Sequence, residues 1–539
     1  MLKKLFSSKN AKLYTILIAG AVVICMLVIL FTAIASDSSR LVFGENQDGT
    51  YYVKDIKSLY RGGIFLKEKL VVPSEYKGEK VVSIEKIESN HIIELVIEDG
   101  IEEIKTGAFT GMEGLKKITI PDSVTYIGGN TFSNCHSLEE VVFPNHIKYI
   151  ENLTFNGCKE LKRFTLPTSC ELIGDNAFSN CPSLEEVVLN DSVKTIGKEA
   201  FKDCTLLSKL NIPTTVTKVG ESAFLNCVSL EELTFSNGLE TIAKNTFSGM
   251  KNLKKVTLPN SVKIIEENAF YDCENLSEIN LPSNLEEIGE NAFANCKEIQ
   301  SLTISNNIKV IDNNAFFGAI KLETINVNLA NVEVGYNVFE GTKFAENAYK
   351  ANDGFLVIDG VLYDFSSEEY KESKNVETID NLIIPVIVST INTGAFYDAV
   401  DFKAVTIPVT VLKIGKEAFS VSSKINSSYE KLKVVYFTGA VEVGKDAFKG
   451  NKELKAKVFV TELTEALVVA DESNSVLEKA RSVYGALGVY YTNVYLTKDD
   501  EKNKVTSQLS YDVGKCEIYR MNDGVKEIFN EKTYTFEAE

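Results

Sequence analysis

Histidine, on which many catalytic and metal sites depend, is scarce in this chain of 539 residues. Histidine occurs only as His91, His136 and His146, and none of them stands in a His-Glu-x-x-His motif or beside a nucleophile elbow. No Cys-x-x-Cys pair supplies the spacing of a zinc site. We therefore expect no enzyme activity, no catalytic residues, no metal ligands and no cofactor.

Positive charge is also in deficit. The chain has 57 Lys and Arg against 75 Asp and Glu, a formal net charge of −18. Because such a surface repels phosphate backbones, we expect no nucleic-acid partner.

Charge is absent altogether from residues 13–35. About 20 apolar helical residues cross a membrane, so this run predicts a transmembrane signal anchor. Four lysines in residues 1–12 predict a cytoplasmic N-terminus and an exported body by the positive-inside bias. The small residues Ala33 and Ala35 also fit a cleavage site, so a cleaved signal peptide and a secreted protein are the alternative.

What the chain does contain is a repeat. A phenylalanine recurs every 23 residues. The members of the series are Phe109, Phe132, Phe155, Phe178, Phe201, Phe224, Phe247, Phe270, Phe293, Phe316 and Phe339. In the unit "LKKVTLPNSVKIIEENAFYDCEN" (253–275), alternation around Val256 predicts a short strand, which Pro259 ends by removing a ladder donor. Phe270 and Cys273 have the spacing of one helical turn, which predicts a short α-helix or 3₁₀ turn. Because one unit cannot bury its own apolar face, the units must stack as an α/β repeat solenoid with a parallel sheet.

The unit LxxVxLPxxVxxIxxxAFxxCxx resembles the leucine-rich repeat of the BspA-like bacterial surface proteins, also called the Treponema-type repeat, over about residues 66–456. The resemblance implies a curved solenoid with its parallel sheet on the concave face, displayed on a bacterial surface and used for adhesion or protein binding.

The expected organisation has seven segments. They are a cytoplasmic basic segment (1–12), the transmembrane anchor (13–35), a linker and lead-in (36–65), repeats with an N-terminal cap (66–340), a hairpin insertion (341–380), further repeats (381–456) and a small, mostly β C-terminal domain (457–539). The hairpin is predicted by Asp359-Gly360 between two apolar-alternating runs. Within the C-terminal segment, residues 475–488 are expected to be helical.

Seven cysteines share one position of the repeat: Cys135, Cys158, Cys181, Cys204, Cys227, Cys273 and Cys296. Thiols in adjacent coils would lie about 5 Å apart, so distance alone does not exclude disulfides. Met112, Met250 and Ala319 occupy the same position in other units. Since these residues share only an apolar character, the pattern favours a buried small hydrophobe over a redox or metal role.

Two columns of side chains are expected on the exposed face of the sheet. One alternates in sign: Glu94, Lys117, Glu140, Arg163, Glu186, Lys209, Glu232, Lys255 and Glu278. Pairs of opposite charge on neighbouring strands of this column would fix the register of the strands and cancel the electrostatic field of the column. The other column, interrupted by Val142 and Val188, supplies our candidate ligand contacts: Thr119, Thr165, Asn211, Thr234, Thr257, Asn280, Thr303 and Asn326. Its small, uncharged side chains suit a protein strand or a glycan, and equally suit plain sheet packing.

Together these features predict a non-catalytic, single-pass protein of a bacterial plasma membrane, whose external repeats bind or adhere to an extracellular protein or glycan. The alternative is a passive surface spacer that presents a ligand-binding C-terminal domain. Loops at the rim and the predicted hairpin are further candidates for specificity.

Overall fold

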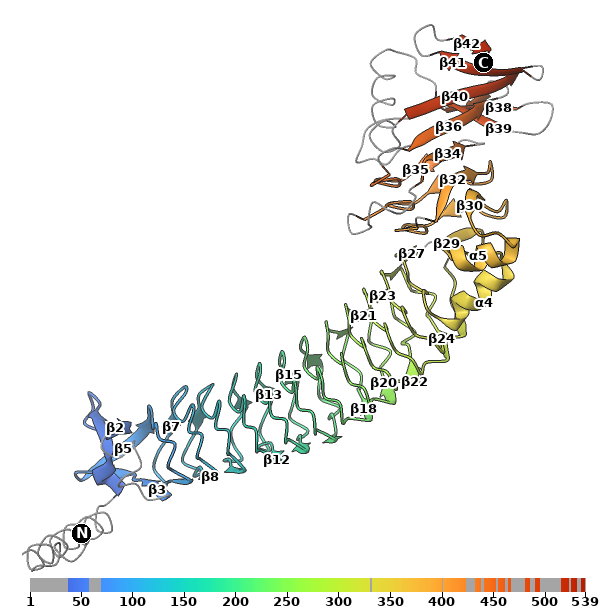
Figure 1. Cartoon of the computed structure of the whole chain (residues 1–539). Helices are drawn as coiled ribbons and strands as arrows, with labels where there is room; N and C mark the ends of the chain where they lie inside the picture. The colour runs from blue at the N-terminus through green and yellow to red at the C-terminus, as the bar shows by residue number, and fades with distance from the viewer. Residues whose placement is uncertain are drawn as a thin grey trace, which may run out of the picture. The chain divides into compact units, whose positions relative to one another are not determined.

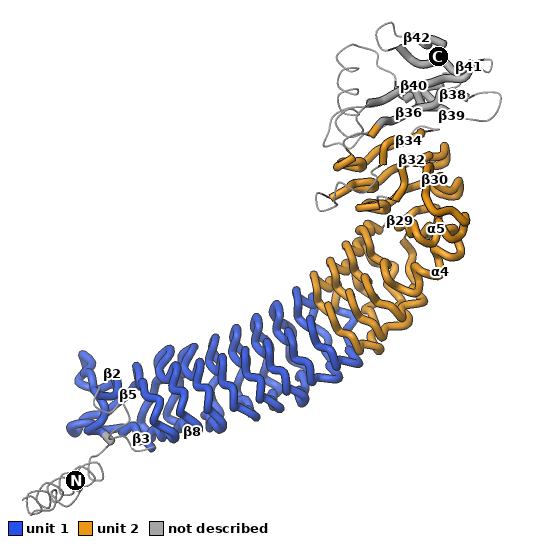
Figure 2. The backbone as a smooth tube through the Cα atoms, in the orientation of Figure 1, with its two compact units in different colours: residues 1–261 blue, residues 262–539 orange. Residues whose placement is uncertain are grey.

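The computed structural model describes residues 37–57, 69–329, 332–399, 401–422, 432–437, 441–451 and 454, together with the backbone of the strands β36 to β42. These residues form two compact units, divided between Ser261 and Val262 (Figure 2). The predicted membrane segment 13–35 lies outside the described residues. Among the residues that are described, no helix is long and apolar enough to cross a membrane.

Unit 1 is a stack of coils, each with two short strands (Figure 1). The first strands are β6 (Glu94–Ile97), β8 (Lys117–Thr119), β10 (Glu140–Val142), β12 (Arg163–Thr165), β14 (Glu186–Val188), β16 (Lys209–Leu210), β18 (Glu232–Thr234) and β20 (Lys255–Thr257). The second strands are β7 (Glu103–Ile104), β9 (Tyr126–Ile127), β11 (Tyr149–Ile150), β13 (Leu172–Ile173), β15 (Thr195–Ile196), β17 (Lys218–Val219) and β19 (Thr241–Ile242).

In both rows, most strands pair in parallel with the equivalent strand of the next coil. Lys117 lies opposite Glu140 in the first strands, and Leu172 lies opposite Tyr149 in the second strands. The predicted solenoid of parallel strands is therefore confirmed. The second strand of each coil was not predicted, because two residues are too few to show an alternating pattern.

The turn that carries each phenylalanine is not helical, which corrects the expectation from spacing. Asn176 and Asn180, on either side of Phe178, have left-handed backbone angles with φ of 55° and 58°. Such residues interrupt a right-handed helix. The Phe178 N–H instead donates to the carbonyl of Ala200 in the next coil at 2.8 Å. Asn, Asp and Gly recur at the two flanking positions because they tolerate this conformation best.

The core of unit 1 is a column of stacked rings. Phe178 lies between Phe155 and Phe201, with ring centroids 5.2 and 5.4 Å away and ring planes within 15° and 5° of its own. All three rings are fully buried. Each phenylalanine thus joins two coils, and the stack has no internal break at which a single coil could separate.

The N-terminal end of unit 1 carries extra structure. It comprises the 3₁₀ helix η1 (Asp37–Arg40), β1 (Leu41–Glu45), β2 (Tyr51–Ile56), β3 (Lys69–Val72), β4 (Glu75–Tyr76) and β5 (Glu79–Ile84). The hairpin β1–β2 joins β5 and extends the row of second strands, while β3 pairs with β6 and extends the row of first strands. Part of the expected linker at 36–65 is therefore folded onto the repeats.

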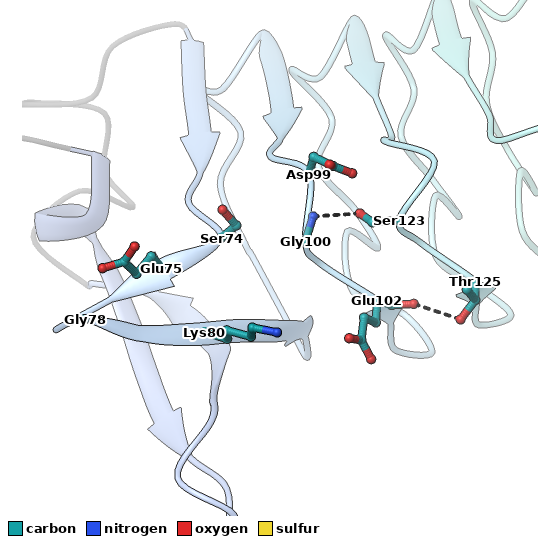
Figure 3. Close-up of a pocket in the computed structure, with 9 residues that line it drawn as sticks. All are labelled: Ser74, Glu75, Gly78, Lys80, Asp99, Gly100, Glu102, Ser123 and Thr125. Carbon is teal, nitrogen blue, oxygen red and sulfur yellow. Dashed lines mark hydrogen bonds between the residues drawn. The ribbon is translucent and has the colours of Figure 1, made fainter.

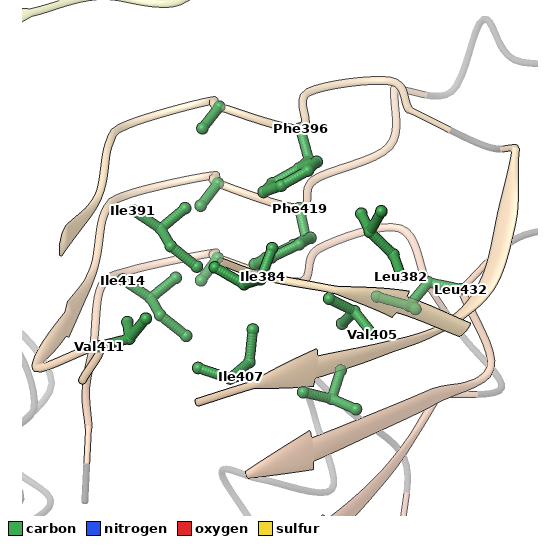
Figure 4. Close-up of a cluster of buried hydrophobic side chains, with 14 of the residues drawn as sticks. Leu382, Ile384, Ile391, Phe396, Val405, Ile407, Val411, Ile414, Phe419 and Leu432 are labelled. Carbon is green, nitrogen blue, oxygen red and sulfur yellow. The ribbon is translucent and has the colours of Figure 1, made fainter. Parts of the chain in front are cut away.

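Unit 2 begins with the same two rows. Its first strands are β22 (Glu278–Asn280), β24 (Ser301–Thr303), β26 (Thr324–Asn326), β30 (Ile379–Ile383), β32 (Phe402–Ile407) and β34 (Val434–Phe437). Its second strands are β21 (Ile264–Ile265), β23 (Glu287–Ile288), β25 (Val310–Ile311), β27 (Glu333–Val334), β31 (Thr390–Ile391), β33 (Lys413–Ile414) and β35 (Glu442–Val443). Figure 4 shows the core of the later coils, where Phe396 and Phe419 stack with their centroids 4.6 Å apart.

An insertion separates the two runs of repeats in unit 2. The predicted hairpin is present as β28 (Phe355–Ile358) and β29 (Val361–Phe365), joined by Asp359 and Gly360 with positive φ angles. β29 also pairs in parallel with β31, so the hairpin continues the row of second strands. Two helices, α4 (Lys343–Ala351) and α5 (Ser367–Lys374), flank the hairpin. They were not predicted, although Thr342 and Ser366 cap their N-termini as such residues usually do.

Strands dominate the described part of the C-terminal segment. They are β36 (Lys455–Val460), β37 (Thr464–Ala466), β38 (Ala480–Tyr484), β39 (Tyr490–Val494), β40 (Lys515–Asn522), β41 (Val525–Asn530) and β42 (Thr535–Ala538). The helix expected over 475–488 is wrong at Ala480–Tyr484, which forms a strand between β37 and β39. Pairing with the two adjacent strands overrides the local helical pattern there.

Candidate binding face of the repeats

The alternating charges lie on the exposed side of the first strands, as the sequence predicts. Lys117 Nζ is 2.8 Å from Glu140 Oε1, and the guanidinium of Arg163 is 3.7 Å from Glu186. The ladder starts one coil earlier than predicted, since Lys69 pairs with Glu94 at 2.8 Å. The hydrogen bond to Glu140 raises the pKa of Lys117.

Similar ladders occur elsewhere on the coils. Lys194 pairs with Glu171 at 2.7 Å beside the second strands of unit 1, and Lys309 pairs with Glu286 at 2.5 Å in unit 2. Exposed pairs of this kind contribute only about 0–1 kcal/mol each. Their main consequence is that acidic and basic charges neutralise each other across coils, so the ladder itself leaves no strong field for a charged ligand.

The candidate contact residues lie two positions beyond this ladder on the same face. Register brings them together across coils in each unit: Thr234 lies opposite Thr257 in unit 1, and Thr303 lies opposite Asn326 in unit 2. All are exposed except the half-buried Thr119 and Thr257. The eight residues are Thr119, Thr165, Asn211, Thr234 and Thr257 in unit 1, and Asn280, Thr303 and Asn326 in unit 2.

These side chains also contact one another. The Asn326 amide donates to Thr303 Oγ1 at 3.3 Å, and farther along unit 2 the Asn381 amide donates to Thr406 Oγ1 at 3.0 Å. Val142 and Val188 are 45% and 48% exposed in the same column of unit 1. The face therefore combines exposed methyl groups with short hydroxyl and amide groups, and its role in ligand contact stays a prediction.

The cysteine column is buried, and its thiols are donors. Cys227 Sγ lies 3.0 Å from the Phe201 carbonyl of the preceding coil, and Cys158 Sγ lies 3.2 Å from that of Phe132. Burial raises the pKa of Cys135 and of Cys181 to about 12. Thiols of this kind are poor nucleophiles and poor metal ligands at neutral pH.

Sequence reasoning missed the donor role because Met and Ala at the same position cannot perform it. A late unit contains the informative residue. Asn451 stands three residues after Phe448, in the cysteine position, and its amide donates to the Phe419 carbonyl of the preceding coil at 2.7 Å. The shared property of Cys and Asn here is therefore donation to the carbonyl of a stacked phenylalanine.

No alternative chemical centre emerges from the described residues. Within them, no group of three or more His, Cys, Asp and Glu side chains could hold a metal ion. His136 faces Glu113 at 3.7 Å, and the His146 ring contacts the Val124 carbonyl at 2.9 Å. Both of these histidine rings thus contact the preceding coil, which is a structural role.

A polar pocket of about 570 Å³ opens near the N-terminal end of unit 1 (Figure 3). Glu75, Asp99 and Glu102 line it together with a single cation, Lys80. Two of its edges are fixed by coil-to-coil hydrogen bonds, one of them from the Gly100 N–H to Ser123 Oγ at 2.9 Å. The residues that line this pocket do not combine a nucleophilic side chain with a general base. We therefore assign no catalytic chemistry to the pocket.

The insertion in unit 2 contains a titratable group that the sequence did not single out. The Tyr349 hydroxyl on α4 donates to Asp364 Oδ2 on β29 at 2.7 Å, and the Phe365 N–H donates to Asp364 Oδ1 at 2.8 Å. Burial raises the pKa of Asp364 to about 7 despite these two hydrogen bonds, and Glu340 adds to the rise.

Exposed aliphatic side chains gather on two coils of unit 2, and these were also missed. Val386, Ile387 and Leu412 are 70%, 61% and 66% exposed. In other coils the two residues after the proline are polar, as in Asp122-Ser123. The replacement of such a pair by Val386-Ile387 is the signal in the sequence that could have identified this surface.

Comparison with known proteins places the repeats in context. A family model described as a BspA type leucine rich repeat region matches residues 86–208, 171–263, 241–352 and 367–466, which together exceed half of the chain. A search of curated proteins finds no match.

Solved structures similar to this chain include a leucine-rich repeat protein from Bacteroides ovatus, with 22% identity, 78% of this chain and 93% of that chain covered, and a TM-score of 0.45. A leucine rich cell surface protein from Faecalibacterium prausnitzii has 25% identity, coverage of 57% and 91%, and a TM-score of 0.39. A leucine-rich repeat protein from Eubacterium ventriosum has 21% identity, coverage of 57% and 93%, and a TM-score of 0.31.

Proposed function

Since the chain belongs to the BspA type leucine-rich repeat family, we propose that it is a non-catalytic scaffold on a bacterial cell surface that binds an extracellular protein or glycan. Family membership supports an interaction scaffold in general terms. The finer proposal, that the ligand contacts the exposed face of the first strands, depends on the geometry of that face.

One observation carries this proposal. Small polar and β-branched side chains recur in register on successive first strands, and most of them are exposed. Each coil therefore offers a similar contact at a fixed spacing, so a long ligand can make many weak contacts at once. Many weak contacts on a rigid array give high avidity without any single strong site.

The buried thiols support the absence of catalysis in this proposal. Their pKa values are raised, and their sulfurs already donate to backbone carbonyls. We further propose that residues 13–35 hold the protein in the plasma membrane with the repeats outside, because the uncharged run follows four lysines. Alkaline carbonate extraction of membranes tests the anchor: an integral protein stays in the pellet, whereas a cleaved, secreted form is found in the medium.

The binding face is tested with the full chain in detergent, screened against a panel of extracellular-matrix proteins and a glycan array. Thr165→Lys and Thr234→Lys each place a long charged side chain on the candidate face. Thr125→Lys, at an exposed position beside a second strand of the same unit, is the matched control. We expect the first two variants to lose at least about tenfold in affinity, roughly 1.4 kcal/mol, and the control to bind as the wild type does.

Binding that survives both substitutions would place the ligand elsewhere. It would then favour the spacer hypothesis, in which the repeats only present the C-terminal strands.

A further inference from the structure

Two exposed tyrosines stand in consecutive coils on the row of second strands in unit 1. Tyr126 in β9 and Tyr149 in β11 hold the same repeat position and are 43% and 47% exposed. They are the only exposed tyrosines among the residues whose side chains the structure describes. The equivalent residue is Glu103 in the preceding coil and Leu172 in the following one. The aromatic pair is therefore a local feature of two coils and not a property of the repeat.

The two coils that carry these tyrosines are held firmly together. The His146 ring of the second coil contacts the Val124 carbonyl of the first at 2.9 Å, close to both tyrosines in sequence. The same two coils stack their buried rings, Phe132 and Phe155, with centroids 5.3 Å apart. This coil spacing is close to the length of one hexose unit, and a fixed pair of rings loses little entropy when a ligand binds.

The polar pocket of Figure 3 adjoins the first of the two tyrosines. Thr125 lines the pocket and directly precedes Tyr126 in the chain. The Thr125 hydroxyl donates to the Glu102 carbonyl of the preceding coil at 3.3 Å. An exposed aromatic side chain and a pocket with carboxylate, ammonium and hydroxyl groups therefore meet at this part of unit 1.

The charged side chains of the pocket differ from the ladders elsewhere on the coils. Glu171, at the same repeat position as Glu102, pairs with Lys194 of the next coil, whereas Glu102 has Thr125 as its neighbour in the next coil. Within the described residues, no ion pair or side-chain hydrogen bond engages any of the four charged groups that line the pocket. The carboxylates can accept hydrogen bonds and Lys80 can donate them, so both kinds of group are available to a ligand.

An aromatic surface beside such groups has the chemistry that recognises a sugar. A hexose ring presents C–H groups on one face, which pack against a tyrosine ring, and its hydroxyls require donors and acceptors around it. Three carboxylates, those of Glu75, Asp99 and Glu102, line the pocket against the single ammonium group of Lys80. A sugar that carries carboxylate or sulfate groups is therefore repelled, and an uncharged sugar is favoured.

We propose that Tyr126, Tyr149 and the adjacent pocket form a binding site for an uncharged oligosaccharide. Two consecutive sugar rings stack on the two tyrosines, and the next sugar unit places its hydroxyls among the carboxylates and Lys80 of the pocket. The site adds a second surface to the scaffold function proposed above and does not depend on the face of the first strands.

The test uses the full chain in detergent and isothermal titration calorimetry. The probes are uncharged tetrasaccharides of glucose, N-acetylglucosamine, galactose or mannose, and a tetramer of galacturonic acid is the charged counterpart of the galactose tetramer. We expect at least one uncharged tetramer to bind and the charged tetramer not to bind. Saturation-transfer NMR from the tyrosine rings should reach the C–H protons of the bound sugar.

Substitutions on the second strands locate the site. Tyr126→Ala and Tyr149→Ala should each weaken sugar binding at least about fivefold, because each removes one stacking surface. Tyr126→Phe keeps the ring and should stay within about twofold of the wild type. Lys218→Ala is the matched control, since Lys218 is exposed at the same repeat position three coils beyond Tyr149. Thermal unfolding verifies that each variant is folded.

Three results would overturn the inference: no binding of any uncharged tetramer, unchanged binding by both alanine variants at the tyrosines, or an equal loss on Lys218→Ala. The two proposals also fail separately. Thr165→Lys and Thr234→Lys should leave sugar binding unchanged. Thr125→Lys places a long side chain beside Tyr126, so it should weaken sugar binding while a ligand of the first strands is unaffected.

Discussion

The recurring cysteine offers the sharpest test of how the coils are held together. In unit 1, Cys227 donates through Sγ to the Phe201 carbonyl at 3.0 Å, and the Cys204 N–H donates to the same oxygen at 3.1 Å. Replacing Cys227 with Ala therefore leaves this carbonyl one donor. We expect a modest loss of stability and no change in ligand binding.

The magnitude follows from two small terms. Removing one buried sulfur costs roughly as much as removing one methylene, about 1 kcal/mol. The S–H group is a weak donor, and the Phe201 carbonyl keeps its other hydrogen bond, so losing the S–H bond adds less than about 1 kcal/mol to the loss of stability. Phe224→Ala in the same coil should cost about 3–5 kcal/mol, because it empties a fully buried position between two stacked rings.

Urea denaturation followed by circular dichroism measures both variants. The comparison should use transition midpoints, since repeat arrays can depart from two-state unfolding. Reaction with a thiol reagent at pH 8 provides a second measurement: burial raises the pKa of Cys227, so the native thiol should stay unmodified until unfolding exposes it.

Three results would refute this reasoning. One is a Cys227→Ala variant as unstable as Phe224→Ala. Another is loss of ligand binding on removal of the thiol, which would make the column functional. The third is rapid modification of the native cysteine.

Further predictions concern strain, pH and the charge ladder. Leu153 adopts a left-handed φ of 61°, and the equivalent residue of the next coil is Asn176. Leu153→Asn should therefore raise the free energy of unfolding by up to about 1 kcal/mol, and Asn176→Leu should lower it by a similar amount. Urea denaturation measures both changes. The raised pKa of Asp364 means that the native state binds its proton more tightly, so stability should fall as pH rises from about 4 to 7. Asp364→Asn should flatten that profile, and an unchanged profile would contradict the assignment. Lys117→Glu should put three like charges in one column and lower the melting temperature more at low salt than at high salt, whereas the same shift at both would exclude an electrostatic cause.

The amino-acid sequence alone determined the solenoid, because its information is local and repeated. A phenylalanine every 23 residues, a strand ended by proline and an inward cysteine leave stacking as the only way to bury the apolar face of each unit. The sign-alternating column was equally visible, since parallel strands in register place residues of equal repeat position side by side. The hairpin at Asp359-Gly360 followed from turn chemistry.

Only the tertiary structure decided features that depend on the strands and coils packed beside a segment. The second strands are too short to be recognised without the adjacent coil, and the turn around Phe178 is not helical because its N–H bonds to Ala200 in the next coil. Ala480–Tyr484 is a strand because β37 and β39 pair with it. The donor role of the cysteines likewise depends on the carbonyl that the preceding coil presents. Local pattern therefore fixes the period of this protein, and contacts between coils fix which backbone groups are satisfied.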